Sequence, residues 1–289
     1  MTDNPIEVAW LVQEGINDEY LPQLRQAVVD RGMELRTFHH SKESPDSIAQ
    51  WFQEEDCVVF HGSLNYAREL MGRQPYWCVW ADPWSFECTT YYPRLRDDKG
   101  FTPLLNGNYI MLPAGDLPAR KMWLSDVTGG CGQLFVRPNK GTKQFTGFVL
   151  NLDKDIHDQI DLHMHRPCPE DLILAAPAHR LGREWRLICT KQSVVAGSQY
   201  MRAGKPEIQP GVPNAVVELA NQTISKCGFI RDPMFTMDIA EVCGLGARLA
   251  VIELNSFGAA GWYGALIPDI VDAASQQAVG EYKIIWDIL

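Results

Sequence analysis

Over the first third of the chain, short apolar runs alternate with segments of helical periodicity, and this alternation limits the possible folds more than any other feature. Gly32 follows the first helical pattern, at a position where glycine commonly ends a helix. Strands that alternate with helices form parallel sheets, because a parallel neighbour can start only after a long crossover. The predicted strands are 7–12, 33–38, 57–60 and 76–80, and the predicted helices are 18–31 and one that begins at Ser44-Pro45. We therefore expect an open parallel α/β sheet.

The pattern changes after a stretch rich in proline, glycine and aromatic residues, from Asp82 to about Arg120. We place a domain junction there, with an α/β domain at 1–95 and a second domain at 96–289. Strand pairs dominate the second domain, and they favour an α+β fold with antiparallel sheets. Its predicted strands are 134–137, 147–150, 172–176, 185–190, 193–198 and two final strands, and its predicted helices are 153–165 and 215–227.

The charge balance argues against a protein that coats nucleic acid. The 289 residues include 26 Lys and Arg against 36 Asp and Glu, a net charge of −10 with the acids spread along the chain. Binding along duplex phosphates needs clustered basic residues, so no duplex nucleic acid partner is expected. The N-terminus lacks a signal-peptide pattern, and the longest apolar stretch, 257–268, is too short to span a bilayer. We expect a soluble cytoplasmic protein without a membrane partner.

Two apolar strands near the C-terminus carry polar residues at one end. They run from Phe235 to Cys243 and from Ala247 to Asn255. If Leu245-Gly246 forms a two-residue turn, Asp238 lies opposite Glu253 and Thr236 lies opposite Asn255. Strand alternation then places these side chains on one face of the hairpin. Apolar residues complete that face near the turn: Ala240, Val242, Leu249 and Val251.

The opposed acids Asp238 and Glu253 favour a metal site. Carboxylates roughly 5 Å apart repel each other, so either one is protonated or both bind a cation. Oxygen ligands without His or Cys suit Mg²⁺ or Mn²⁺, which often bridge to nucleotide phosphates. A solvated hairpin whose acids face water is the simpler alternative. We favour the metal, because Glu253 directly follows the strongly β-forming run 249–252, where an unpaired charge would be costly.

Two further groups of charged residues suggest anion binding less strongly. Arg137 ends the predicted strand 134–137, and a polar loop with Lys143 follows it, which suits either phosphate binding or a solvated basic turn. Glu184 and Arg186 share one face of the hairpin 185–198, and Arg202 follows its second strand. Such residues are often ordinary salt-bridge partners.

Taken together and in order, these motifs resemble the ATP-grasp ligases, in particular the RimK-like subgroup found in phages and bacteria. The resemblance covers about residues 120 to 265. It implies a pre-ATP-grasp α/β domain at 1–95, followed by an ATP-grasp domain at 96–289 with an N-subdomain at about 120–176 and a C-subdomain at about 177–289. The segments that carry it are Phe135-Val136-Arg137-Pro138, Glu184-Trp185-Arg186-Leu187, Asp238 and Val251-Ile252-Glu253-Leu254-Asn255.

The resemblance also implies a metal and phosphate site, carried over position by position. Asp238, Glu253 and Asn255 would hold Mg²⁺ (or Mn²⁺) against the phosphates of ATP. Arg137 would make the phosphate contact that a lysine usually makes, with Lys143 beside it. This departure keeps the charge but replaces a point donor with a planar fork.

The remaining implied roles concern the nucleoside and the substrate. Backbone groups near Ala175 and Ala176 would contact adenine, and Glu184 would reach the ribose. Arg186 and Arg202 would face the γ-phosphate and the acceptor carboxylate. The tail Ser256 to Gly264 would line the acceptor site.

The activity implied by the resemblance is ATP- and Mg²⁺-dependent ligation of a carboxylate to an amine through an acyl phosphate. The substrates would be small molecules or peptides. Two alternatives stay open, namely a phosphotransferase on the same fold and a nucleotide-binding protein without turnover.

Overall fold

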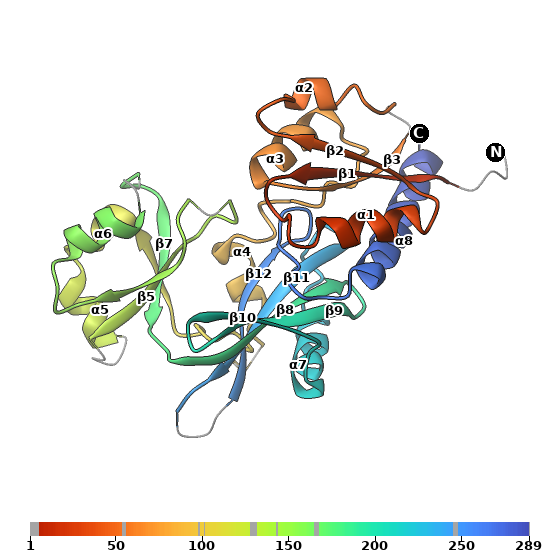
Figure 1. Ribbon diagram of the computed structural model, residues 1–289. Helices are drawn as coiled ribbons and strands as arrows, with labels where there is room; N and C mark the ends of the chain where they lie inside the picture. Colours follow the sequence, from red (N-terminus) through yellow and green to blue (C-terminus); the bar gives the residue numbers. More distant parts are fainter. Residues whose placement is uncertain are drawn as a thin grey trace.

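The computed structural model describes residues 6–53, 56–97, 99–100, 102–127, 132–142, 144–164, 168–244 and 248–288. Three sheets organise these residues (Figure 1). A parallel sheet near the N-terminus forms the α/β lobe, a five-stranded antiparallel sheet forms the large sheet, and a four-stranded antiparallel sheet at 110–177 forms the small lobe. The small lobe stands to one side of the other two parts (Figure 1). The expected α/β plus α+β architecture is confirmed.

The α/β lobe is built on three parallel strands in the order β2-β1-β3. Apolar side chains occupy nearly all of β1 and β3, as expected for strands buried on both faces. Its elements are β1 (Val8–Glu14), α1 (Leu21–Val29), β2 (Glu34–His39), α2 (Pro45–Ile48), β3 (Cys57–His61) and α3 (Leu64–Arg73). The strand predicted at 76–80 is wrong, because only a single bridge joins Cys78 to Val59 there.

The last helix, α8 (Ile267–Ile288), packs against the first sheet although the whole chain separates them. Trp10 of β1 and Ile270 of α8 share one hydrophobic core, and the Trp10 indole donates a 3.2 Å hydrogen bond to Ser275 Oγ. Figure 1 shows α8 lying beside α1. The sequence patterns did not predict this helix. Among the described residues, no helix combines the length and the apolar character needed to cross a bilayer.

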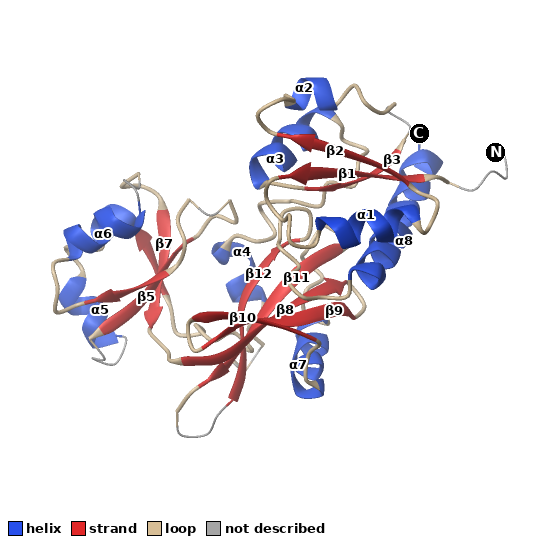
Figure 2. Ribbon diagram, viewed as in Figure 1, coloured by secondary structure: helices blue, strands red, loops and turns tan. Residues whose placement is uncertain are grey.

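The large sheet has the strand order β10-β9-β8-β11-β12. One face packs against α7 (Asn214–Ile224) and α4 (Cys88–Arg94) through a hydrophobic core that includes Trp185 and Met237. Figure 2 shows α7 on one side of these strands. The opposite face carries the polar residues considered below. The strands are β8 (Leu181–Thr190), β9 (Val194–Arg202), β10 (Lys205–Pro210), β11 (Met234–Val242) and β12 (Arg248–Ser256).

The small lobe has the strand order β4-β7-β5-β6 and a hydrophobic core of its own. That core contains buried residues between Leu112 and Ala175 only. The predicted strands here are confirmed, whereas β4 and α5 were not predicted. Its elements are β4 (Ile110–Pro113), a short 3₁₀ turn (Ala114–Asp116), α5 (Lys121–Val127), β5 (Gln133–Pro138), β6 (Phe148–Asn151), α6 (Ile156–Met164) and β7 (Leu172–Pro177).

The pairing of β11 with β12 confirms the predicted register at the open end of the hairpin. Asp238 faces Glu253 and Thr236 faces Asn255. A register shift follows between Asp238 and Ile239, so Ile239 pairs with Val251. Because Ile252 is the extra residue, Val251 joins the hydrophobic core behind the sheet, and its predicted place on the polar face is wrong. The turn at Leu245-Gly246 lies outside the described residues.

Candidate active site

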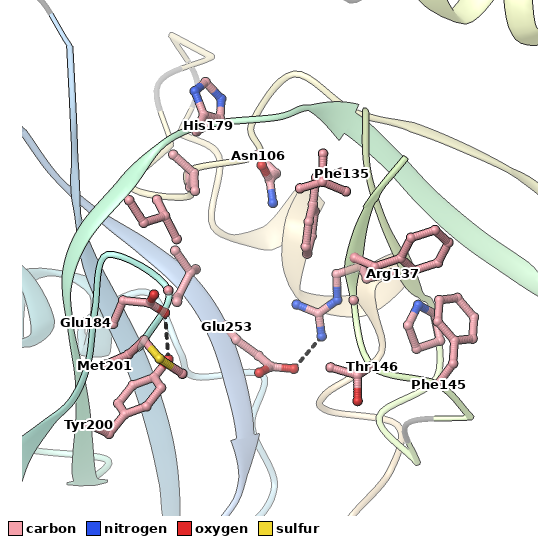
Figure 3. Close-up of a pocket in the computed structure, with 18 residues that line it drawn as sticks. Asn106, Phe135, Arg137, Phe145, Thr146, His179, Glu184, Tyr200, Met201 and Glu253 are labelled. Carbon is pink, nitrogen blue, oxygen red and sulfur yellow. Dashed lines mark hydrogen bonds and ion pairs between the residues drawn. The ribbon is translucent and has the colours of Figure 1, made fainter. Parts of the chain in front are cut away.

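A cavity of about 560 Å³ lies between the small lobe and the polar face of the large sheet. The connection between β7 and β8 closes one side of it with His179, and the segment before β4 adds Leu105 and Asn106 (Figure 3). The walls combine aromatic and aliphatic side chains with a few charged groups, as is typical of ligand sites. The principal lining side chains are Phe135, Arg137, Phe145, Thr146 and Phe148 of the small lobe and Leu181, Glu184, Tyr200, Met201, Ile252 and Glu253 of the large sheet.

Three charged residues form a row across neighbouring strands of the large sheet. Arg186 of β8 is paired with Asp238 of β11, which is paired in turn with Glu253 of β12. Directly opposed residues have Cβ atoms roughly 4.5 to 5.5 Å apart and stand on one face. The juxtaposition of the two carboxylates is therefore confirmed, and an arginine that was predicted on a different argument stands beside them.

Arg186 and Asp238 form a buried bidentate ion pair. Arg186 Nε donates to Asp238 Oδ1 at 2.8 Å, and Arg186 Nη2 donates to Asp238 Oδ2 at 2.7 Å. The two residues are only 8% and 2% exposed. Burial alone would lower the pKa of Arg186, but the Asp238 carboxylate and two nearby tyrosines together raise it. The guanidinium thus stays charged, and it compensates the Asp238 carboxylate.

Arg137 and Glu253 form the second ion pair, which crosses the cavity from the small lobe to the large sheet (Figure 3). Arg137 Nη2 donates to Glu253 Oε1 at 2.6 Å, and Arg137 Nη1 donates to Tyr91 Oη at 3.1 Å. Arg137 is 7% exposed, and its Nε is buried without a hydrogen-bond partner among the described residues. The site therefore holds two carboxylates and two guanidinium groups whose charges balance.

Two stacked tyrosines cover Arg186. The rings of Tyr200 and Tyr263 lie 4.9 Å apart at 11°, and the guanidinium carbon of Arg186 lies 5.7 Å and 5.2 Å from their respective centroids. Tyr200 Oη donates to Glu184 Oε2 at 3.0 Å. Burial raises the pKa of Glu184, and the nearby Asp238 carboxylate adds to this effect. Tyr263 adopts φ 51°, an uncommon conformation for a residue other than glycine.

The α/β lobe meets this row through the segment that follows β12. Arg186 Nη1 donates to the Gly261 carbonyl at 3.3 Å, and the neighbouring Trp262 stacks on His61, at the end of β3, with centroids 4.0 Å apart. His61 Nε2 and Tyr20 Oη are hydrogen-bonded at 2.8 Å. Burial lowers the pKa of His61 to about 3, so this imidazole is neutral. The carboxyl ends of β1 and β3 thus lie next to Arg186.

The donor set of the predicted metal site suits a hard cation. Asp238 and Glu253 offer carboxylates, and Asn255 offers an amide whose Nδ2 is buried without a partner in the described part of the chain. Two carboxylates and one amide leave coordination positions for phosphate oxygens and water, as Mg²⁺ prefers. No group of three or more His, Cys, Asp or Glu that could hold a metal occurs within the described ranges.

The remaining predicted residues are distributed unevenly. Glu184 lines the cavity, but Lys143 lies outside the described residues. Arg202 is exposed at the end of β9 and forms an ion pair with Glu207 at 3.6 Å. Ala175 and Ala176 are fully buried within β7, which pairs with β5, while His179 and Leu181 contribute the cavity wall beyond them.

Several cavity and site residues were not predicted. Tyr91 and Asn106 belong to the stretch of weak periodicity between Asp82 and Arg120, where no pattern distinguishes a site residue from a loop residue. Tyr200 gave a weak signal, because it precedes Arg202 at the end of a predicted hairpin strand. Only the folded chain brings these residues to the same cavity.

The fold matches solved structures of ATP-dependent ligases, each at low sequence identity. A D-cycloserine synthetase, DcsG, matches with a TM-score of 0.66 and 11% identity over 94% of this chain and 99% of that one. The D-alanine-D-alanine ligase from Coxiella burnetii matches with 0.66 and 13% over 98% of each chain. A RimK domain protein from Sphaerobacter thermophilus DSM 20745 matches with 0.53 and 14% over 95% and 97%. No curated protein matches the sequence significantly.

Family membership follows from the sequence itself. Residues 119–273 match the model of an ATP-grasp domain, the second family of its clade, which covers more than half of the chain and includes both ion pairs of the site. ATP-grasp enzymes use ATP together with Mg²⁺ or Mn²⁺. The chain therefore belongs to the ATP-grasp superfamily, in the family that this model describes.

Proposed function

We propose that the protein is an ATP- and Mg²⁺-dependent ligase that joins a carboxylate to an amine through an acyl phosphate. The observation that carries this proposal is the charged row of Arg186, Asp238 and Glu253 at the cavity, with Arg137 reaching Glu253 from the opposite wall. This arrangement supplies metal ligands and phosphate ligands on adjoining surfaces. Stabilising a transferred phosphoryl group requires both.

The two ion pairs suit an exchange of partners when nucleotide and metal bind. Asp238, Glu253 and Asn255 would hold Mg²⁺, which neutralises phosphate charge when it is bound. Arg137 and Arg186 would then be released from their carboxylates and could donate to phosphate oxygens, which accept bidentate hydrogen bonds from arginine. Before binding, each arginine prevents a carboxylate from being buried without compensation.

The proposed reaction has two steps. An oxygen of the substrate carboxylate attacks the γ-phosphorus of ATP, the bond to ADP breaks, and an acyl phosphate forms. The amine then attacks the acyl carbon, so that inorganic phosphate leaves and the amine loses a proton. Arg186 is well placed to stabilise the charge that develops on the phosphoryl group, because it lies beside Asp238 on the face that carries Glu253. Positioning and charge neutralisation would supply most of the catalysis.

The acceptor substrate would bind where the α/β lobe meets Arg186. Tyr200 and Tyr263 form an aromatic wall there, and the carboxyl ends of β1 and β3 adjoin it through Trp262 and His61. Open α/β sheets bind ligands at the carboxyl ends of their strands, where the strand order reverses. In the order β2-β1-β3 that position lies between β1 and β3. We propose a small amino acid or a short peptide as the acceptor.

Hydroxylamine trapping tests the acyl phosphate directly. The protein is incubated with MgATP and pools of amino acids or dipeptides, first with hydroxylamine and then with candidate amines. The proposal expects ADP and a hydroxamate in the first case and an amide in the second. A stable phosphorylated product that forms without any amine would instead establish a phosphotransferase. Nucleotide binding without ADP formation under every condition would favour a binding protein.

A further inference from the structure

The segment from Thr102 to Tyr109, which precedes the small lobe, is fixed along the edge of β12. Leu105 N donates to the Val251 carbonyl at 2.8 Å, and Val251 N donates to the Pro103 carbonyl at 2.9 Å. Leu104 and Val251 form a parallel bridge at the same place. Arg96 Nη2 holds the next turn through the Gly107 carbonyl at 2.5 Å. These contacts give the intervening residue, Asn106, a fixed position.

Asn106 lies in the wall of the cavity between the two sheets. It is 5% exposed, and its Oδ1 is buried without a hydrogen-bond partner in the described part of the chain. In the view of Figure 3 its amide is directed into the cavity and lies well apart from Glu253 and Thr146. A buried amide that lacks partners is uncommon in folded proteins. Its position on a cavity wall indicates that a ligand completes its hydrogen bonds.

The surroundings of Asn106 differ from those of the charged row. Leu105, Leu181 and Ile252 supply aliphatic side chains to the cavity, and Phe135 supplies an aromatic ring. The ionic groups, Arg137 and Glu253, are paired with each other elsewhere on the wall. A nucleotide has the same asymmetry, because its base is flat and weakly polar whereas its phosphates are ionic. The phosphates suit the charged part of the cavity, so the base suits the part that contains Asn106.

We propose that Asn106 binds the base of the nucleotide and gives the site its preference for adenine. A side-chain amide offers one donor and one acceptor side by side. Adenine presents the complementary pair on one edge, an amino group next to a ring nitrogen, whereas guanine presents two acceptors there. The inference rests on ATP use by this family and extends it to a residue that lies before the matched segment 119–273.

Calorimetric titration with MgATP and MgGTP tests the inference without relying on turnover. Asn106→Leu removes both hydrogen-bonding groups at nearly constant size, and Asn106→Asp keeps the size but replaces the donor with an acceptor. Asn108→Leu is the matched control, because Asn108 belongs to the same segment and is exposed. Melting curves without nucleotide show whether each variant is folded, and Asn106→Asp serves if Asn106→Leu is not.

The wild type is expected to bind ATP more tightly than GTP, and both Asn106 variants should weaken ATP binding about tenfold with little effect on GTP. The control should bind both nucleotides as the wild type does. Unchanged ATP affinity in a folded Asn106 variant, or an equal loss for ATP and GTP, would overturn the role in base recognition. If the wild type itself binds no ATP, the nucleotide site of the proposed function fails as well.

Discussion

The guanidinium of Arg137 on β5 donates to the carboxylate of Glu253 on β12 at 2.6 Å, so one ion pair joins the two walls of the nucleotide cavity. Each residue was predicted to bind a different part of the ATP and metal complex. In the protein alone they bind each other. The same holds for Arg186 and Asp238 one strand further along the sheet. The charges that the substrates need are therefore already present and mutually compensated.

Replacing Glu253 with Gln should abolish the effect of Mg²⁺ on nucleotide binding. The amide keeps the size of the side chain but removes the negative charge that a metal requires. We expect turnover to fall on the order of 100-fold or more, and the thermal shift caused by ATP to become independent of Mg²⁺. Glu241→Gln is the matched control, because Glu241 pairs with Arg183 on the same sheet outside the cavity. Mg²⁺-dependent turnover that survives Glu253→Gln would refute the metal assignment.

Replacing Arg186 with Met should strongly destabilise the fold. The substitution leaves the Asp238 carboxylate buried without its partner, which typically costs about 3 to 5 kcal/mol. The equivalent change at Arg183, whose side chain is 45% exposed, should cost about 1 kcal/mol or less. Urea unfolding of both variants measures the difference. The double variant Arg186→Met with Asp238→Leu should recover much of the loss, and equal stability of the two single variants would show that the buried pair is not held as described.

At position 263, glycine should be more stable than alanine. Tyr263 has φ 51°, in the left-handed region where a Cβ atom costs roughly 1 to 2 kcal/mol. Both substitutions remove the stack on Tyr200, so their difference isolates the backbone conformation. Thermal or urea unfolding of Tyr263→Gly and Tyr263→Ala provides the test. An alanine variant as stable as the glycine variant would mean that the backbone leaves this conformation once the ring is gone.

The buried His61 should make stability fall with acid. Its pKa is about 3 in the folded chain, below the ordinary value of about 6.5 for an unfolded histidine. Between these values the unfolded chain binds a proton that the folded chain does not, so stability falls as pH falls, by up to about 1.4 kcal/mol per unit. Burial raises the pKa of Asp232 to about 7, which contributes the opposite slope. The sign for His61 therefore has to be read from a difference.

The useful comparison is between the wild type and His61→Gln, measured by urea unfolding at several pH values from 4 to 8. The glutamine can keep a hydrogen bond to Tyr20 but cannot titrate. The wild type should lose more stability than the variant on acidification below about pH 6.5. Parallel stability curves for the two proteins would show that His61 does not remain neutral in the fold.

The sequence predicted the catalytic face because that face depends on local pattern. Opposed residues on a hairpin follow from alternation and register, so Asp238, Glu253 and Asn255 were placed correctly relative to one another. The bulge at Ile252 restored the expected pairing even though the pairs nearer the turn are shifted by one residue. Its effect on Val251 was not predictable, because a bulge has no clear signature in an apolar run.

Other features depend on contacts between distant segments, which no periodicity reveals. The short run at 76–80 has strand composition, yet the chain forms only one bridge there. Tyr91 and Asn106 reach the cavity from an irregular stretch. The roles assigned to Lys143, Ala175, Ala176 and Arg202 stay predictions, as do the domain limits, the RimK-like affiliation, a phage or bacterial origin and a cytoplasmic location.

The packing of α8 against the first sheet has a consequence for motion. Trp10 of β1, Ile188 of β8, Met234 of β11 and Ile270 of α8 belong to one hydrophobic core, whereas the small lobe has a separate core. The α/β lobe and the large sheet therefore move as one rigid unit that carries Asn106, Arg186 and both carboxylates, with the small lobe attached through the chain before β4 and after β7. Rotation of the small lobe would separate Arg137 from Glu253 while it leaves Arg186 on Asp238. The protein can thus admit and release its nucleotide without disturbing the surface that aligns the acceptor.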